Sequence, residues 1–347
     1  MQRTRLQEDK NSMHWKQMCG PIVLIPLLSP LHSQHSDVWR EPSPHTVQFV
    51  QVDKDVRLEV LDWGGSGRPV ILLAGGGDTA HVFDEFAPKL TANWRVYGIT
   101  RRGFGTSTYS PLDKGGDRLG EDVLAVIRTL RLKKPVLVGH SIAGVELSSV
   151  ATLHPDSIAG VVYLEAAYPY AFDNGKGPAM KDFSELPGGA GQPPVPSESD
   201  LASFSALQKW DAQTYGFQLP ESEFRQTWDS TSGGRVTKQR DFPGSQMFMT
   251  IMTSSKKYAS VPVPALAIFA IPNVPETWMT KSANPAIHSA ADTYFARLDL
   301  LKEKQAKAFE DGVPGARVVR VRGTHYIFLS NESDVLREMR SFLSNLQ

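Results

Sequence analysis

A serine within a turn of small residues is the feature of this sequence that most strongly indicates chemistry. Ser141 lies in the segment 139–144 (Gly-His-Ser-Ile-Ala-Gly), which follows an apolar run at 135–138 and precedes a helical pattern at 145–151. A strand, a tight turn around a serine and a helix are the context of a nucleophile elbow. We therefore expect Ser141 to expose a nucleophilic hydroxyl at the end of a strand.

A serine hydroxyl is a poor nucleophile until a base accepts its proton, and that base is nearly always histidine. Five histidines follow residue 45, and His325 is the one placed directly after the last predicted strand, in Gly323-Thr324-His325-Tyr326. In a parallel sheet this loop emerges at the same edge as Ser141. The sequence therefore predicts His325 as the base.

The acid that would orient the imidazole has three candidates. Glu165 ends the strand that follows the elbow helix, next to the elbow strand, and is the favoured one. Glu276 and Asp173 are the alternatives, because the loop after 264–270 offers no carboxylate in its first five positions. Glu165 could instead shape the pocket without serving as the acid.

Backbone N–H groups that would stabilise an oxyanion are expected from two places. One is the run Gly75-Gly76-Gly77, which follows a strand and opens a helix. The other is the residue after the nucleophile. These positions point to Gly76 and Ile142 as the oxyanion hole.

The same glycines allow a competing interpretation. Gly75-x-Gly77-x-x-Ala80 after a strand matches a dinucleotide fingerprint, and Arg101 or Arg102 at the end of the next strand could bind a 2′-phosphate. An NADP-dependent oxidoreductase is therefore an alternative, although it leaves Ser141 and His325 without a role. We otherwise expect no cofactor, and no metal site, because the histidines are scattered along the chain.

Alternating strand and helix patterns must position these residues. Two antiparallel strands come first, and strands and helices then alternate, which predicts an α/β fold with a mostly parallel sheet and helices on both faces. The predicted strands are 46–52, 56–61, 69–74, 95–100, 135–138, 158–164, 264–270 and 316–321. The predicted helices are one beginning near Val82 and others at 117–130, 145–151, 290–311 and 333–345.

One long insertion interrupts the alternation. Residues 171–258 begin with a Gly/Pro/Ser-rich stretch and continue with helical patterns at about 199–214, 220–230 and 244–257, rich in Trp, Phe and Met. We predict a helical cap there, inserted into a core formed by 46–170 and 259–347.

The first 45 residues differ from the rest. Basic residues precede a short apolar stretch at 19–28 and a polar segment, which resembles a secretory signal followed by a disordered tail. The stretch is too short and too broken by proline to span a bilayer stably. The sequence thus predicts a secreted or periplasmic protein, or otherwise a cytoplasmic one.

The amino-acid composition limits the classes of partner that we expect. With 37 basic and 37 acidic residues the net charge is zero, so no electrostatic surface for nucleic acid is expected. Cys19 is the single cysteine and cannot form a disulfide framework within the chain. A small-molecule substrate is expected, and the oligomeric state is not predicted.

From Val56 to its C-terminus the chain resembles the α/β-hydrolase superfamily, in its cap-bearing, serine esterase-like branch. The resemblance rests on 74–77, 102–107, 139–144 and 323–326. Ala74 stands where this family customarily has histidine, and Ala143 where it has glycine. The zearalenone lactonases are similar in taking a glutamate after the strand that follows the elbow.

These features together predict a serine hydrolase that cleaves carboxylic esters of apolar or aromatic small molecules through an acyl-enzyme. The same residues could cleave lactones or amides. A ligand receptor built on a hydrolase scaffold is a further alternative.

Overall fold

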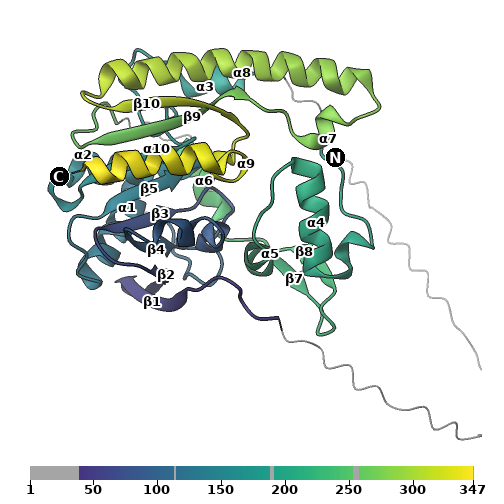
Figure 1. Ribbon diagram of the computed structural model, residues 1–347, viewed down its shortest axis with the longest axis horizontal. Helices are drawn as coiled ribbons and strands as arrows, with labels where there is room; N and C mark the ends of the chain where they lie inside the picture. The colour runs from purple at the N-terminus through teal and green to yellow at the C-terminus, as the bar shows by residue number, and fades with distance from the viewer. Residues whose placement is uncertain (1–38, 113–114, 188–190, 253–257, 347) are drawn as a thin grey trace, which may run out of the picture. The chain divides into compact units, whose positions relative to one another are not determined.

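The computed structural model describes residues 39–112, 115–187, 191–252 and 258–346 (Figure 1). Residues 41–347 form one compact unit, which contains all the helices and strands described below. Of the leader predicted over 1–45, residues 1–38 lie outside the described ranges.

An eight-stranded sheet forms the centre of the second unit, in the order β1-β2-β4-β3-β5-β6-β9-β10. The β1–β2 and β2–β4 pairs are antiparallel, and every other neighbouring pair is parallel. This confirms the predicted mostly parallel sheet. The strands are β1 Thr46–Asp53, β2 Val56–Gly64, β3 Pro69–Leu73, β4 Arg95–Ile99, β5 Val136–His140, β6 Gly160–Leu164, β9 Ala265–Asn273 and β10 Arg317–Gly323.

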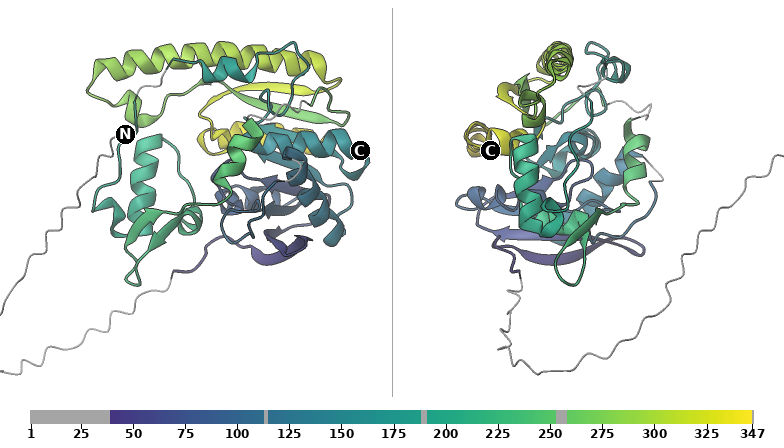
Figure 2. Two further views of the ribbon diagram at one scale, coloured as in Figure 1. Left: turned by 180° about the vertical axis from the view of Figure 1, so that it is seen from behind. Right: turned by 90° about the vertical axis from the view of Figure 1, so that its right-hand side faces the viewer.

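Helices cover both faces of this sheet, because successive side chains of its buried strands point to opposite sides (Figures 1 and 2). On β5, Leu137 packs in one apolar cluster and Val138 in the other. The Leu137 cluster includes side chains of α1 Gly116–Thr129, α2 Gly144–Leu153 and α8 Pro285–Gly312. The Val138 cluster includes side chains of η1 Ala80–Phe83, η2 Ala87–Leu90, α9 Ile327–Ser330 and α10 Glu332–Asn345.

Two covering elements differ from their predicted form. The helix expected after the glycine run forms the two short 3₁₀ helices η1 and η2, and Pro88 stands at the beginning of the second. The helix expected at 290–311 begins earlier, at Pro285, where the Asn284 side chain accepts a hydrogen bond from the Ala286 backbone. Asparagine before proline is a favourable helix start.

The segment between β6 and β9 contains helices and one hairpin. In Figure 1 α4, α5 and the hairpin lie beside the sheet. The helix predicted over 220–230 is wrong at its end, because the chain turns into strand β7 at Trp228 and returns through a turn containing Gly234, whose φ is +82°. The elements are α3 Met180–Ser184, η5 Asp200–Ala202, α4 Phe204–Tyr215, α5 Glu221–Thr227, β7 Trp228–Ser230, β8 Val236–Gln239 and α6 Ser245–Met252.

Three short helices complete the fold: η3 Ser141–Ala143, η4 Pro155–Ser157 and α7 Thr277–Thr280. Within the described ranges, no helix has both the length and the apolar character that a bilayer span requires.

Candidate active site

Ser141 occupies a strained turn at the end of β5. Its φ is +53°, in the left-handed region that non-glycine residues rarely adopt. The turn packs closely against the end of β6, since a Cβ on Gly144 would lie 1.9 Å from the Ala166 carbonyl oxygen. The predicted strand–turn–helix context is therefore present, with Ser141 half-buried at the carboxyl end of the sheet.

His325 lies in the loop between β10 and α9 and reaches Ser141 from the other end of the chain. Its Nε2 is 2.9 Å from Ser141 Oγ, across 184 positions of sequence. The side chain is 46% exposed. A base at this distance can accept the hydroxyl proton directly.

Glu165 lies behind His325. It follows β6 with a φ of +50°, its side chain is fully buried, and its Oε2 is 3.3 Å from His325 Nδ1. Tyr168 donates its hydroxyl proton to the same oxygen at 2.7 Å, and the backbone N–H of Ala270 donates to Oε1. The carboxylate is thus held on both oxygens, with one of them directed at the imidazole.

A buried lysine keeps that carboxylate charged. Lys302 on α8 places Nζ 2.6 Å from Glu165 Oε2 and 2.7 Å from Asn273 Oδ1. Burial alone would raise the pKa of Glu165, but the Lys302 ammonium and the contact with His325 lower the pKa to about 2. Glu165 is therefore an anion at neutral pH.

Sequence reasoning missed Lys302, although one signal could have found it. In α8 the buried positions include Lys302, Gln305, Ala306 and Phe309, which follow helical spacing. A lysine and a glutamine on the apolar stripe of a helix need buried partners. The partner of Lys302 could not be named, because Glu165 is 137 positions away.

The two alternative acids lie elsewhere. Glu276, before α7, accepts a hydrogen bond from Trp278 Nε1 at 2.6 Å. It lines a cavity with His325, but its hydrogen-bond partner is the Trp278 indole. Asp173 accepts from the Gly175 backbone at 2.8 Å. Of the three predicted carboxylates, Glu165 is the one found at hydrogen-bonding distance from His325.

The glycine loop adjoins the elbow. A Cβ on Gly76 would lie 3.7 Å from Ile142 Cγ2, so the two predicted oxyanion residues come from neighbouring segments. Gly75 has no room for a side chain, because a Cβ would lie 2.7 Å from His140 Nδ1. The glycines therefore allow the loop to approach the elbow closely.

His140 and Tyr170 also contact this site. The His140 ring is buried, and its Nε2 lies 3.0 Å from the backbone oxygen of His325, so the elbow strand holds the histidine loop. Burial lowers the pKa of His140 to about 3, and the ring is neutral. Burial raises the pKa of the Tyr170 hydroxyl, while its hydrogen bond to Ser141 acts in the opposite direction.

Two cavities border His325. One of about 410 Å³ lies toward Tyr168, Tyr294 and Lys302. The other, of about 700 Å³, is lined by residues of the insertion and by 324–326, and we call it the acidic cavity because Asp78, Asp211, Glu223 and Glu276 line it. The site thus has room for a small molecule on the His325 side.

The arginines of the dinucleotide alternative are already paired. Arg101 bonds to both carboxylate oxygens of Glu146, at 2.8 and 2.9 Å, and Arg102 bonds to both oxygens of Asp122. Both guanidinium groups are buried. A 2′-phosphate would have to displace these bidentate ion pairs, which disfavours nucleotide binding here.

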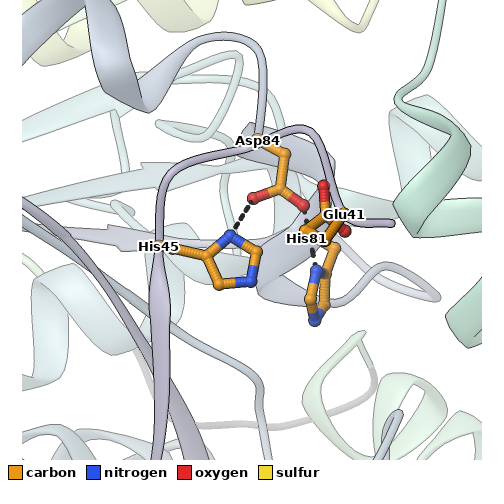
Figure 3. Close-up of side chains that lie close together, drawn as sticks. All are labelled: Glu41, His45, His81 and Asp84. Atoms are coloured by element: carbon orange, nitrogen blue, oxygen red, sulfur yellow. Dashed lines mark hydrogen bonds and ion pairs between the residues drawn. The ribbon is translucent and has the colours of Figure 1, made fainter. Parts of the chain in front are cut away.

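A second group of titratable residues lies outside this site. Glu41, His45, His81 and Asp84, which we call the Asp84 cluster, place one potential ligand atom each within 4.8 Å of the others (Figure 3). The sequence did not suggest it, because His45 fell within the predicted tail. These are the described residues whose geometry could hold a metal.

In the Asp84 cluster, hydrogen-bond donors and a protonated His81 surround the Asp84 carboxylate, which disfavours a metal there. Asp84 lies between the two imidazoles (Figure 3), with His45 Nδ1 and His81 Nδ1 each 2.9 Å from one of its oxygens. Ser222 and Trp63 also donate to this carboxylate. Although burial lowers the pKa of His81, its hydrogen bond to Asp84 and the Glu59 carboxylate 3.7 Å away raise the pKa to about 10, so the ring carries a proton where a metal would bind.

Comparison with known proteins identifies the family. A family model described as "Alpha/beta hydrolase family" matches residues 70–338, which run from β3 to the middle of α10. Among solved structures, E-2-(acetamidomethylene)succinate hydrolase superposes with a TM-score of 0.58 at 17% identity, over 86% of this chain and 99% of that one. The esterase RhEst1 from Rhodococcus gives 0.54 at 17% identity, over 87% and 99%. At such identities these structures show the fold alone.

Relatives by sequence match a shorter part of the chain. A serine hydrolase-like protein of Danio rerio is 32% identical over 106 residues, which is 30% of this chain and 32% of that protein. A bifunctional esterase/perhydrolase of Acinetobacter calcoaceticus is 30% identical over 126 residues, or 35% and 45% of the two chains. The chain thus matches less than half the length of these relatives. The family model, in contrast, covers most of the chain, and the protein belongs to the alpha/beta hydrolase family.

Proposed function

We propose that this protein is a serine hydrolase that cleaves carboxylic esters, with Ser141 as nucleophile, His325 as base and Glu165 as the acid. The observation that carries the proposal is the continuous contact from Ser141 Oγ to His325 Nε2 at 2.9 Å and from His325 Nδ1 to Glu165 at 3.3 Å. This is the arrangement in which a histidine removes a serine proton while a carboxylate orients the ring.

The reaction proceeds in two steps. Ser141 Oγ attacks the acyl carbon as His325 Nε2 takes its proton, and the N–H groups of Gly76 and Ile142 bind the oxyanion. His325 then gives the proton to the leaving alkoxide oxygen, and the alcohol departs. A water molecule, deprotonated by His325, then attacks the acyl carbon of the acyl-enzyme. The bond from that carbon to Ser141 Oγ breaks as His325 returns the proton to this oxygen, and the carboxylic acid is released. Glu165, held ionised by Lys302, stabilises the imidazolium in both steps.

The insertion is the proposed cap over this reaction. Trp210, Phe217, Phe224 and Trp228 from residues 171–258 line the acidic cavity beside His325. Aromatic side chains supply apolar contact area for an organic substrate. We therefore assign the apolar or aromatic part of the ester to this side of the site.

Labelling with a fluorophosphonate, followed by a series of p-nitrophenyl esters, tests the proposal. We expect labelling of Ser141 and turnover that falls by a factor on the order of 10⁴ or more in Ser141→Ala. Unlabelled protein without turnover would contradict the enzyme assignment and leave a receptor role. Lactones and anilides in the same assay separate the alternative bonds.

The acid is tested by two variants. Glu165→Gln should lower kcat by a factor on the order of 10² or more, because the amide cannot stabilise the imidazolium. A larger loss in Glu276→Gln than in Glu165→Gln would move the acid to Glu276.

A further inference from the structure

We propose that the acidic cavity binds a positively charged group, so that the preferred substrates are esters with an alkylammonium in the alcohol part. This inference rests on the proposed function, because it names the substrate class of the same site. His325 protonates the leaving alkoxide, and the acidic cavity borders His325. The other cavity beside His325 is lined by Lys302, which disfavours a cation there, so we assign the alcohol part to the acidic cavity.

The lining of the acidic cavity is rich in carboxyl groups. Four carboxylates from separate segments line the cavity: Asp78 after β3, Asp211 on α4, Glu223 on α5 and Glu276 before α7. Its described lining includes neither lysine nor arginine. Two cations act on these acids from outside the lining, Arg101 on Asp78 and His81 on Glu223, and they are already bonded to Glu146 and Asp84. The cavity therefore favours a cation from outside.

Asp211 has a buried carboxylate oxygen, Oδ2, without a hydrogen-bond partner among the described residues. The residue is 7% exposed. The other acids have neutral donors: Tyr326 for Asp78, Thr79 for Glu223 and Trp278 for Glu276. A buried carboxylate without a partner is costly, and an ammonium group in the cavity would reduce that cost.

Aromatic side chains form one wall of the same cavity. Trp210, Tyr215, Phe217 and Tyr326 form a continuous row, with ring centroids 6.5, 6.3 and 5.0 Å apart in that order. The row ends beside His325, and all four residues line the acidic cavity. Faces of aromatic rings attract alkylammonium groups, and the attraction increases where water is excluded. Rings and carboxylates together select a bulky organic cation over an inorganic one.

The raised pKa values of two acids in the cavity agree with the binding of a cation. Burial, together with the charges of neighbouring acids, raises the pKa of Asp211 to about 7 and that of Glu223 to about 8. An arriving cation favours the ionised forms, so binding should release protons near neutral pH. A neutral polyol, which protonated carboxyls could also bind, would not produce this release.

A matched pair of esters tests the inference. Choline and 3,3-dimethylbutanol differ by N⁺ in place of carbon, so esters of the two with one acyl group differ in charge but hardly in shape. We expect kcat/KM for the choline ester to exceed that of the neutral ester about tenfold or more. Equal values, or a preference for the neutral ester, would overturn the inference while leaving the hydrolase intact.

Failure of the underlying function has a different signature. If neither ester is hydrolysed and the fluorophosphonate does not label Ser141, the proposed function fails. Labelling with hydrolysis of the neutral ester alone contradicts only the cation site.

Two variants test whether Asp211 causes the preference for the charged ester. Asp211→Asn should lower the ratio of the two kcat/KM values at least about fivefold, since it removes the unpaired charge. The control is Asp156→Asn, which changes an exposed carboxylate in η4. Because η4 precedes β6 and Glu165 follows it, Asp156 lies at the end of β6 that is away from the site. This substitution should leave the ratio unchanged. A ratio equally insensitive to both variants would overturn the assignment of Asp211.

Binding can be measured without turnover. Tetramethylammonium added to weakly buffered protein at pH 7 should release protons in saturable fashion, and Asp211→Asn should release fewer. Absence of saturable release in the wild type would contradict the cation site even if the variant fails to fold.

Discussion

Buried carboxylates near His325 differ in whether the protein supplies them with a cation. Glu165 has the Lys302 ammonium 2.6 Å away, and its pKa is lowered to about 2. Asp211 and Glu223 face other acids across the acidic cavity, and burial raises their pKa values to about 7 and about 8. Burial acts alike on both groups, so the supplied cation decides which carboxylate is charged.

Removing that cation should produce the largest effect. Lys302→Met leaves Glu165 buried without its counter-charge, which should lower the free energy of unfolding by about 3–5 kcal/mol. The pKa of Glu165 should rise, so the acid limb of the pH–rate profile should move to higher pH. Denaturant unfolding and kcat against pH measure both.

A matched control separates charge from packing in that experiment. Lys302→Arg keeps a cation in α8 and should retain the acid limb nearer to its original position. A profile unchanged in Lys302→Met would show that Glu165 does not depend on the lysine.

Removing a charge from the acidic cavity should increase stability, in contrast to the loss expected for Lys302→Met. Asp211→Asn eliminates an unpaired buried anion, and we expect an increase in stability of about 2 kcal/mol at pH 8. Thermal unfolding measures this, with Asp156→Asn expected to change little. Destabilisation by Asp211→Asn would mean that the charge has a partner supplied by the protein.

The stability of the fold should also depend on pH through Asp211. The pKa of Asp211 is raised from an ordinary 3.8 to about 7, so the unfolded chain loses its proton first as pH rises. The folded state therefore loses stability between about pH 4 and pH 7. The stability difference between Asp211→Asn and wild type should shrink toward zero as pH falls through this window, and a constant difference would contradict the assignment.

The smallest expected effect concerns a neutral donor to Glu165. Tyr168→Phe removes the 2.7 Å hydrogen bond but leaves Lys302, so the loss should be about 1 kcal/mol. Chemical denaturation of this variant beside Lys302→Met checks the order. A loss as large as that of Lys302→Met would show that hydrogen bonding, rather than charge, holds the carboxylate.

Local sequence patterns predicted much of the fold and part of the site. Apolar runs located the buried strands, and small residues around Ser141 indicated its turn. Patterns could not predict the β7–β8 hairpin, because Trp228 continues the helical spacing that began at 220. They also could not predict the acidic cavity, since Asp78 and Glu223 are separated by 145 positions and meet only through tertiary packing.

The left-handed backbone shared by Ser141 and Glu165 has a consequence for how this protein can change. The adjacent parallel strands β5 and β6 are each followed by a residue with positive φ, a conformation that costs glycine less than other residues. Glycine, however, has neither a hydroxyl nor a carboxylate. At both strand ends, substitutions that relax the chain remove the very atoms that face His325. Selection for a more robust fold must therefore act elsewhere in the molecule.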